Sequence, residues 1–276
     1  MPAYARPTRL DDALKLLARG GRTVLAGGTD YYPARVGKPL RDDVLDVTAL
    51  PELRGIREKP DHWRIGATAT WSEVIEAELP PCFDCLKLAA REIGGRQIQN
   101  AGTVAGNLCN ASPAADGVPP LLALDASVEV ANGRGRKAVP LSSFIIGPRQ
   151  TALEPGELVT AILVPKPEHD AASHFLKLGA RKYLVISIAM VAALIEKRNG
   201  RVKSARVAVG ACSPVAKRLP EMEKDLTGIE AKKLSTFKIE SRHLASLSPI
   251  DDVRGSAAYR LEAARILVQR MLEKLA

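Results

Sequence analysis

Two glycine-containing segments hold the residues best suited to chemistry. Residues 24–30 run from an apolar stretch into Gly27 and Gly28, which a threonine and an aspartate follow. Residues 103–116 place Gly106 among hydroxyl and amide side chains. Glycine lets backbone N–H groups approach an anion without interference from a Cβ atom. Both segments are therefore interpreted as phosphate-holding loops, and two such loops favour one large dinucleotide.

The first loop is a weak signal by itself, because a pair of glycines after a strand is often only a connection between elements. It lacks the Gly-x-Gly-x-x-Gly spacing and no strongly helical segment follows it directly, so a Rossmann site is disfavoured. The sequence also lacks a Gly-x-x-x-x-Gly-Lys-Ser/Thr loop, which argues against ATP hydrolysis.

The second loop is more specific. The stretch from Ile93 to Asp116 contains only short apolar pieces and is predicted to be one long functional loop. Its short polar side chains would make a poor core but suit hydrogen bonds to a ribityl chain, ribose hydroxyls or a pyrophosphate. These side chains are Gln97, Asn100, Thr103, Asn107, Asn110, Ser112 and Asp116. A glycine-rich surface loop without a ligand is the alternative.

The cysteines and histidines do not predict a metal site. The four cysteines are too few and too scattered for a disulfide framework or a four-thiolate iron–sulfur site. Cys82 and Cys85 are close in sequence, but no second pair of Cys or His lies near them, so structural thiols are favoured. The four histidines form no i, i+4 pair.

Charge limits the classes of partner. The net charge is +9, and the whole surplus lies in residues 166–276, which hold 21 Lys and Arg against 12 Asp and Glu. Aromatic residues make up only 4% of the chain, whereas single-strand nucleic-acid sites interleave aromatics with cations, so nucleic acid is disfavoured. A solvated basic face or a docking surface for an acidic protein is favoured instead.

The hydropathy pattern bears on localisation. No apolar run is long enough to span a membrane, and the first residues lack the apolar region of a signal peptide. The sequence therefore predicts a soluble, cytoplasmic protein without membrane insertion.

Short elements must position the two loops. Residues 22–26 are predicted to form a buried strand that delivers the chain into the first loop, after a helix capped by Thr8. Residues 44–47 are a second strand candidate, so the first loop belongs to a small αβ unit.

A second unit precedes the long loop. It begins with the alternating strand at residues 63–68 and continues with a helix capped by Thr70, where Glu73 stands at the capping-box position. A further helix is expected over residues 83–91, and strands resume at residues 128–130 and 158–164.

The rigid, polar run of residues 165–170 is the best linker candidate, because the charge balance changes there. We place one domain at residues 1–170, with subdomains at about 1–52 and 53–170, and a second domain at residues 171–276. In the second domain, sheet is expected at 175–179, 186–195 and 202–209, and a closing helix at 256–275.

At the level of motifs, the chain resembles the FAD-binding medium subunit of the molybdenum hydroxylases, the family of carbon monoxide dehydrogenase and xanthine dehydrogenase. The segments that carry this resemblance are residues 25–30, 100–107 and 110–116. It extends over nearly the whole chain through residues 147–149, 153–159, Lys177 with Arg181, and residues 252–260. Several spaced motifs in the same order make a chance resemblance improbable.

The resemblance implies an α+β fold. In this family a two-subdomain FAD-binding domain of the PCMH type holds FAD without a covalent bond, and a C-terminal α+β domain with a three-stranded sheet follows. By match, the first loop contributes Val24, Leu25, Ala26, Gly27, Gly28, Thr29, Asp30 and Tyr31 to the cofactor site, and the second contributes Thr103, Val104, Ala105, Gly106 and Asn107. Further cofactor contacts are implied for Asp116, Ile93, Val159 and Lys177, and Ile186 is implied to lie against the isoalloxazine ring.

The resemblance also implies a function. The chain would be the flavin subunit of a heteromeric molybdenum-containing dehydrogenase or hydroxylase, an oxidoreductase complex. Its FAD would take electrons from the 2Fe–2S clusters of an iron–sulfur small subunit and pass them to NAD, oxygen, a quinone or another carrier. The molybdopterin would lie on a large subunit. No residue of this chain is then a catalytic side chain or a metal ligand.

Two alternatives stay open at this point. A self-contained FAD-dependent oxidase or reductase of the wider class would have its own substrate pocket and would reduce its flavin without partners. A binding or assembly protein that has lost the cofactor is disfavoured, because both loops keep their glycines and polar residues. Val185 stands where the family often has an aspartate, which leaves the electron acceptor open.

Overall fold

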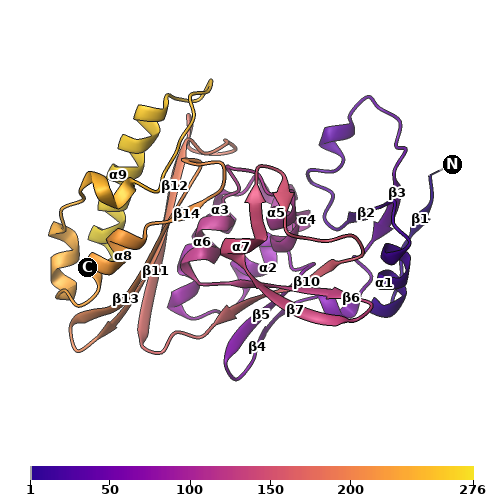
Figure 1. Cartoon of the computed structure of the whole chain (residues 1–276), viewed down its shortest axis with the longest axis horizontal. Coiled ribbons are helices and arrows are strands. Elements are labelled where there is room, and N and C mark those ends of the chain that lie inside the picture. Colours follow the sequence, from indigo (N-terminus) through magenta and orange to yellow (C-terminus); the bar gives the residue numbers. More distant parts are fainter. Residues whose placement is uncertain (1) are drawn as a thin grey trace.

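A computed structural model describes residues 2–276, in which three larger sheets are arranged along the long axis of the molecule (Figure 1) and a fourth has only two short strands. A small N-terminal sheet lies at one end and a central sheet with its helices follows. The C-terminal sheet lies at the other end, with the last helix on its outer side (Figure 1). The mixture of helices and strands confirms the predicted α+β class.

The N-terminal sheet is parallel, with strand order β1-β3-β2. Its elements are β1 (Tyr4–Ala5), α1 (Leu10–Ala18), β2 (Arg22–Leu25) and β3 (Asp43–Asp46). Both predicted strands are present, but the predicted Thr8 cap is wrong. The helix begins at Leu10 with Arg9 as the N-cap residue, so Thr8 stands one position too far from its first N–H groups. Between β2 and β3, residues 26–42 form a long excursion away from the sheet, which contains the 3₁₀-helix η1 (Pro33–Arg35).

The central sheet is antiparallel, with strand order β4-β5-β10-β6-β7. Its strands are β4 (Ile56–Glu58), β5 (His62–Gly66), β6 (Ser127–Asn132), β7 (Gly135–Pro140) and β10 (Leu158–Pro165). The helices of this unit are η2 (Pro51–Leu53), α2 (Trp71–Glu76), η3 (Pro81–Phe83), α3 (Asp84–Glu92), α4 (Arg96–Ala101), α5 (Val104–Asn110), α6 (Val118–Ala123) and α7 (Leu141–Phe144). A hairpin of β8 (Ile145–Gly147) and β9 (Gln150–Thr151) follows α7.

Helix α2 begins as the sequence predicts. The Thr70 side chain accepts a hydrogen bond from the Glu73 backbone N–H (3.2 Å), and the Glu73 carboxylate accepts one from the Thr70 backbone N–H (2.7 Å). Both partners of the capping box are therefore satisfied.

The prediction of one long loop over residues 93–116 is wrong, because α4 and α5 lie within it. In α5, Val104 and Leu108 are fully buried against the core, and the Thr103 side chain caps the first turn. Helices this short are stabilised by tertiary packing rather than by intrinsic propensity. Because the segment is rich in polar residues, its sequence did not indicate that packing.

The C-terminal sheet is antiparallel, with strand order β11-β12-β13-β14. Its strands are β11 (Asp170–Leu178), β12 (Ala189–Arg198), β13 (Arg201–Gly210) and β14 (Lys217–Arg218). The three long strands were expected, and the two-residue β14 was not. The helices that follow are α8 (Pro220–Leu226), η4 (Ala231–Thr236), η5 (Ser241–Leu244) and α9 (Ala257–Leu275).

Strand β12 is buried on both faces. Met190, Ala192 and Leu194 belong to the core that the central unit shares, whereas Val191 and Ile195 belong to a second core with α9. Helices α3 and α6 cover one face of this sheet and α9 covers the other. The core is thus continuous across the sequence position where we place the domain boundary, and the boundary at residue 170 stays a prediction. Among residues 2–276, none of the helices has the length and apolar content required to cross a bilayer.

Candidate functional site

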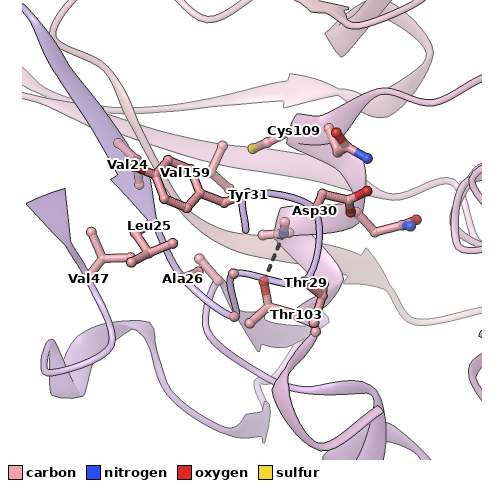
Figure 2. A pocket seen from close by; sticks show the side chains of 18 of the residues that line it. Val24, Leu25, Ala26, Thr29, Asp30, Tyr31, Val47, Thr103, Cys109 and Val159 are labelled. Atoms are coloured by element: carbon pink, nitrogen blue, oxygen red, sulfur yellow. Dashed lines mark hydrogen bonds between the residues drawn. The ribbon is translucent and has the colours of Figure 1, made fainter. Parts of the chain in front are cut away.

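A cavity of about 610 Å³ lies where the N-terminal and central units meet. Its walls come from β2 and the excursion that follows it, from the start of α5 and from the start of β10 (Figure 2). Pockets for cofactors and other small molecules have volumes of about 300–1,000 Å³. The two glycine-containing loops, more than seventy positions apart in sequence, face the same space.

Most of the predicted cofactor residues line this cavity. They are Val24, Leu25, Ala26, Gly27, Gly28, Thr29, Asp30, Tyr31, Ile93, Thr103, Ala105, Gly106, Asn107 and Val159. The exceptions are Val104, Asp116, Lys177 and Ile186, which lie outside it. The roles of all these residues toward a cofactor stay predictions.

Sequence reasoning missed a comparable number of lining residues. They are Thr23, Ala34, Arg35, Val47, Ala67, Trp71, Ile98, Gly102, Cys109, Leu153, Glu157 and Leu158. Asn110, one of the polar side chains predicted in the second loop, also lines the cavity. Most of the missed ones are apolar residues, cysteine or glycine, and no motif distinguishes such residues from ordinary core positions. Arg35 is different because it carries a charge. The sequence shows this cation, but it does not show that the side chain lies on a cavity wall.

The first loop has no room for side chains. A Cβ atom at Gly27 would lie 1.8 Å from the carbonyl oxygen of Ala101, and Gly28 has a φ of +70°. Within residues 2–276, the backbone N–H groups from Gly27 to Tyr31 donate no hydrogen bond. A run of free N–H groups in a tight turn is the cradle that a phosphate requires.

The second loop meets the first at the N-terminal end of α5. The Gly106 N–H donates to Thr103 Oγ1 at 3.0 Å, the bond drawn in Figure 2, and a Cβ atom at Gly106 would lie 2.6 Å from that oxygen. The Oδ1 atom of Asn107 is buried and has no hydrogen-bond partner in the described part of the chain. A buried acceptor without a partner costs free energy, so a ligand hydroxyl that donates to Asn107 would relieve it.

The opposite wall is apolar. Val24 leaves 40% of its surface exposed at the cavity, and Val47 and Val159 lie beside it. Figure 2 shows Val24, Tyr31 and Val159 together on the strand side of the cavity, away from Thr103. A polar glycine-rich wall facing an apolar strand wall fits a ligand with both phosphates and flat rings. The residues present therefore fit FAD.

Tyr31 and Arg35 form one fixed unit on the cavity wall. The guanidinium of Arg35 lies 3.8 Å from the centre of the Tyr31 ring and is paired with Asp42 at 2.6 Å. The Tyr31 hydroxyl donates to the same carboxylate at 3.1 Å. Partial burial and this hydrogen bond to Asp42 raise the pKa of Tyr31, so the phenol stays neutral at physiological pH.

A second polar cluster lies outside the cavity. Asp116, between α5 and α6, accepts hydrogen bonds from Lys177 Nζ and from Ser187 Oγ, both at 2.5 Å. Lys177 Nζ also lies 3.4 Å from the Glu92 carbonyl oxygen. The structure thus pairs the two predicted cofactor residues Asp116 and Lys177 with each other, across the junction of the central unit and the C-terminal sheet.

Ile186 lies in the loop of residues 179–188, between β11 and β12, and is 52% exposed. Arg181 donates to the Leu184 carbonyl oxygen within this loop, and Leu184 lies against Gly95, two residues from the cavity-lining Ile93. The loop therefore borders the Ile93 end of the cavity. Among residues 2–276, no group of three or more His, Cys, Asp or Glu could hold a metal ion.

Comparison with known proteins gives two family matches. Residues 1–167 match the FAD binding domain in molybdopterin dehydrogenase, and residues 174–275 match the CO dehydrogenase flavoprotein C-terminal domain. The xanthine dehydrogenase FAD-binding subunit of Escherichia coli O157:H7 is 32% identical over 99% of this chain and 94% of its own length. The carbon monoxide dehydrogenase medium chain of Hydrogenophaga pseudoflava is 29% identical over 98% of this chain and 95% of its own.

Solved structures agree with the sequence matches. A chain of the reconstituted CO dehydrogenase from Oligotropha carboxidovorans superimposes with a TM-score of 0.88 at 27% identity. The alignment covers 100% of this chain and 97% of that one. The similarity therefore extends from the loop-bearing units through the C-terminal sheet.

Proposed function

Because the chain belongs to the family of FAD-binding subunits of the molybdopterin dehydrogenases, we propose that it holds FAD in the cavity between its two glycine-containing loops and thereby connects an iron–sulfur partner to an external electron acceptor. The observation that carries this proposal is the convergence of both loops on one cavity of about 610 Å³. When bound, FAD supplies the capacity to exchange electrons with a cluster and with an acceptor.

The residues of this chain would bind the cofactor and fix its orientation. The free N–H groups from Gly27 to Tyr31 would hold phosphate oxygens, and Thr103 keeps the start of α5 in place beside them. Asn107 Oδ1 would accept a hydrogen bond from a hydroxyl of the cofactor. The apolar wall at Val24 and Val159 would exclude water from a flat ring.

The proposed function requires partner subunits that carry the other redox centres. Several relatives are named medium subunits or medium chains, among them nicotine 6-hydroxylase and carbon monoxide dehydrogenase. We therefore propose that this chain assembles with a small subunit that carries 2Fe–2S clusters and a large subunit that carries molybdopterin. The acceptor is NAD, oxygen, a quinone or another carrier.

Co-purification of the chain from its native source tests this proposal. We expect flavin, iron and molybdenum in one complex, with flavin that acid or heat releases as FAD. Reduction of the flavin by an organic substrate in the isolated chain would instead establish a self-contained oxidase or reductase. A preparation without flavin, from a chain that also fails to bind added FAD, would refute cofactor binding itself.

A further inference from the structure

The Tyr31–Arg35 unit occupies a distinct part of the cavity wall. Both side chains line the cavity, and both belong to the excursion between β2 and β3, immediately after the first loop. We propose that this unit is a stacking platform for the purine base of a dinucleotide, which makes the cavity selective for FAD over a flavin mononucleotide. The inference rests on the proposed function and deepens it.

The arrangement of donors indicates a platform rather than a phosphate clamp. Arg35 directs Nε and Nη2 at the Asp42 carboxylate (2.7 and 2.6 Å) and Nη1 at the Tyr31 carbonyl oxygen (3.0 Å). All three guanidinium nitrogens are engaged and the charge is balanced, so little is left to attract a phosphate. What the group offers to the cavity is a flat face held in one orientation, and bases stack on such faces.

The backbone ties this platform to the phosphate cradle. The Tyr32 N–H donates to the Gly28 carbonyl oxygen (3.1 Å), and the Ala34 N–H donates to the Asp30 carbonyl oxygen (3.3 Å). The first loop and η1 therefore form one continuous turn, and Arg35 follows the free N–H groups at a fixed spacing. A base joined to a phosphate by one sugar requires such a spacing.

The platform also has a defined position relative to the C-terminal sheet. In Figure 1 the excursion between β2 and β3 lies on the side of α5 away from the C-terminal sheet. Ile93 also lines the cavity, and the loop of residues 179–188, which belongs to the C-terminal sheet, borders it through Gly95. The platform and this loop therefore approach the cavity from different sides, which leaves room for the rest of a dinucleotide between them.

The test compares FAD with FMN on the complete chain after its flavin is removed. Quenching of flavin fluorescence gives both dissociation constants. Arg35→Met keeps an unbranched side chain without the flat face, and we expect it to weaken FAD binding about tenfold, which corresponds to about 1.4 kcal/mol. Its affinity for FMN should not change. Arg35→Lys keeps the charge without the flat face and should lose as much FAD affinity as Arg35→Met.

Arg41→Met is the matched control, because Arg41 is exposed in the same excursion and does not line the cavity. AMP should compete with FAD on the wild-type chain and should compete less on Arg35→Met. Equal losses of FAD and FMN affinity, or full FAD affinity in Arg35→Lys, would overturn the platform. A wild-type chain that binds neither flavin would refute the proposed function instead, so the two failures are distinguishable.

Discussion

Lys177 Nζ lies 2.5 Å from Asp116 Oδ2, and this ion pair connects β11 of the C-terminal sheet with the turn before α6. Both side chains are at least 92% buried. The other oxygen of Asp116 accepts the Ser187 hydroxyl, so one carboxylate holds both ends of the loop that carries Ile186. We interpret the pair as positioning residues for that loop.

Asp116→Asn should destabilise the chain by about 3–5 kcal/mol, because it leaves the Lys177 ammonium buried without a counter-charge. Chemical unfolding measures this loss. Adding Lys177→Met to Asp116→Asn should restore part of the stability, since the unpaired charge is then absent. Lys15→Met serves as the control, because Lys15 is exposed and lies 4.0 Å from its nearest acidic partner. A change below about 1 kcal/mol in Asp116→Asn would contradict a tight buried pair.

Gly27→Ala should abolish tight flavin binding. The added Cβ atom would lie 1.8 Å from the Ala101 carbonyl oxygen, and the atoms that it meets are all backbone, so the loop must shift away from α4. Overpacking of this kind costs about 1–3 kcal/mol. Flavin content per chain and the melting temperature are the two measurements. Gly133→Ala is the control, since no atom lies within 4 Å of its added Cβ. Wild-type flavin content in Gly27→Ala would show that the loop is not the cradle.

Glu129 should make the stability of the central sheet depend on pH in the acidic range. Burial works against its ionised form, but hydrogen bonds from Thr160 (2.6 Å) and Arg64 (2.8 Å) hold the pKa of Glu129 below its usual value of 4.5. The stabilisation is therefore present above about pH 4.5 and is lost as the pH falls through the lower folded-state pKa. Urea midpoints measured between pH 7 and pH 3 should fall less steeply in Glu129→Gln. The exposed Glu78→Gln should follow the wild-type curve.

Assembly with the proposed iron–sulfur subunit should weaken as salt concentration rises. Residues 166–276 carry 21 Lys and Arg against 12 Asp and Glu, which suits an acidic partner. Screening shortens the reach of exposed charges from about 10 Å at 0.1 M salt to about 3 Å at 1 M. Dissociation constants across a salt series provide the measurement. An affinity that does not respond to salt would exclude the basic C-terminal region as the docking surface.

The sequence predicts best where a local signal determines local structure. The capping box at Thr70 needs only neighbouring residues and is present as expected. The role of Gly27 and Gly28 could be proposed for a similar reason, because the groups that would bind an anion are backbone N–H groups of the same short segment.

Partners far apart in sequence could not be predicted from spacing. Asp116 and Lys177 are 61 positions apart, and each looked like an independent cofactor contact until the fold placed them together. Arg35 was missed because a single arginine in the sequence does not predict a binding role. Its role can be proposed only once the cavity that it lines is known. Helices α4 and α5 were hidden because both are short and rich in polar residues, and only Gln99 of α4 and Val104, Ala105 and Leu108 of α5 are buried.

Strand β12, buried on both sides, has a mechanical consequence. Any hinge between the C-terminal sheet and the central unit would expose Met190, Ala192 and Leu194 to water, and burying such side chains again is worth about 25 cal/mol for each Å². The C-terminal sheet and the central unit must therefore move together as one rigid body, which keeps the Ile186 loop at a fixed distance from α5.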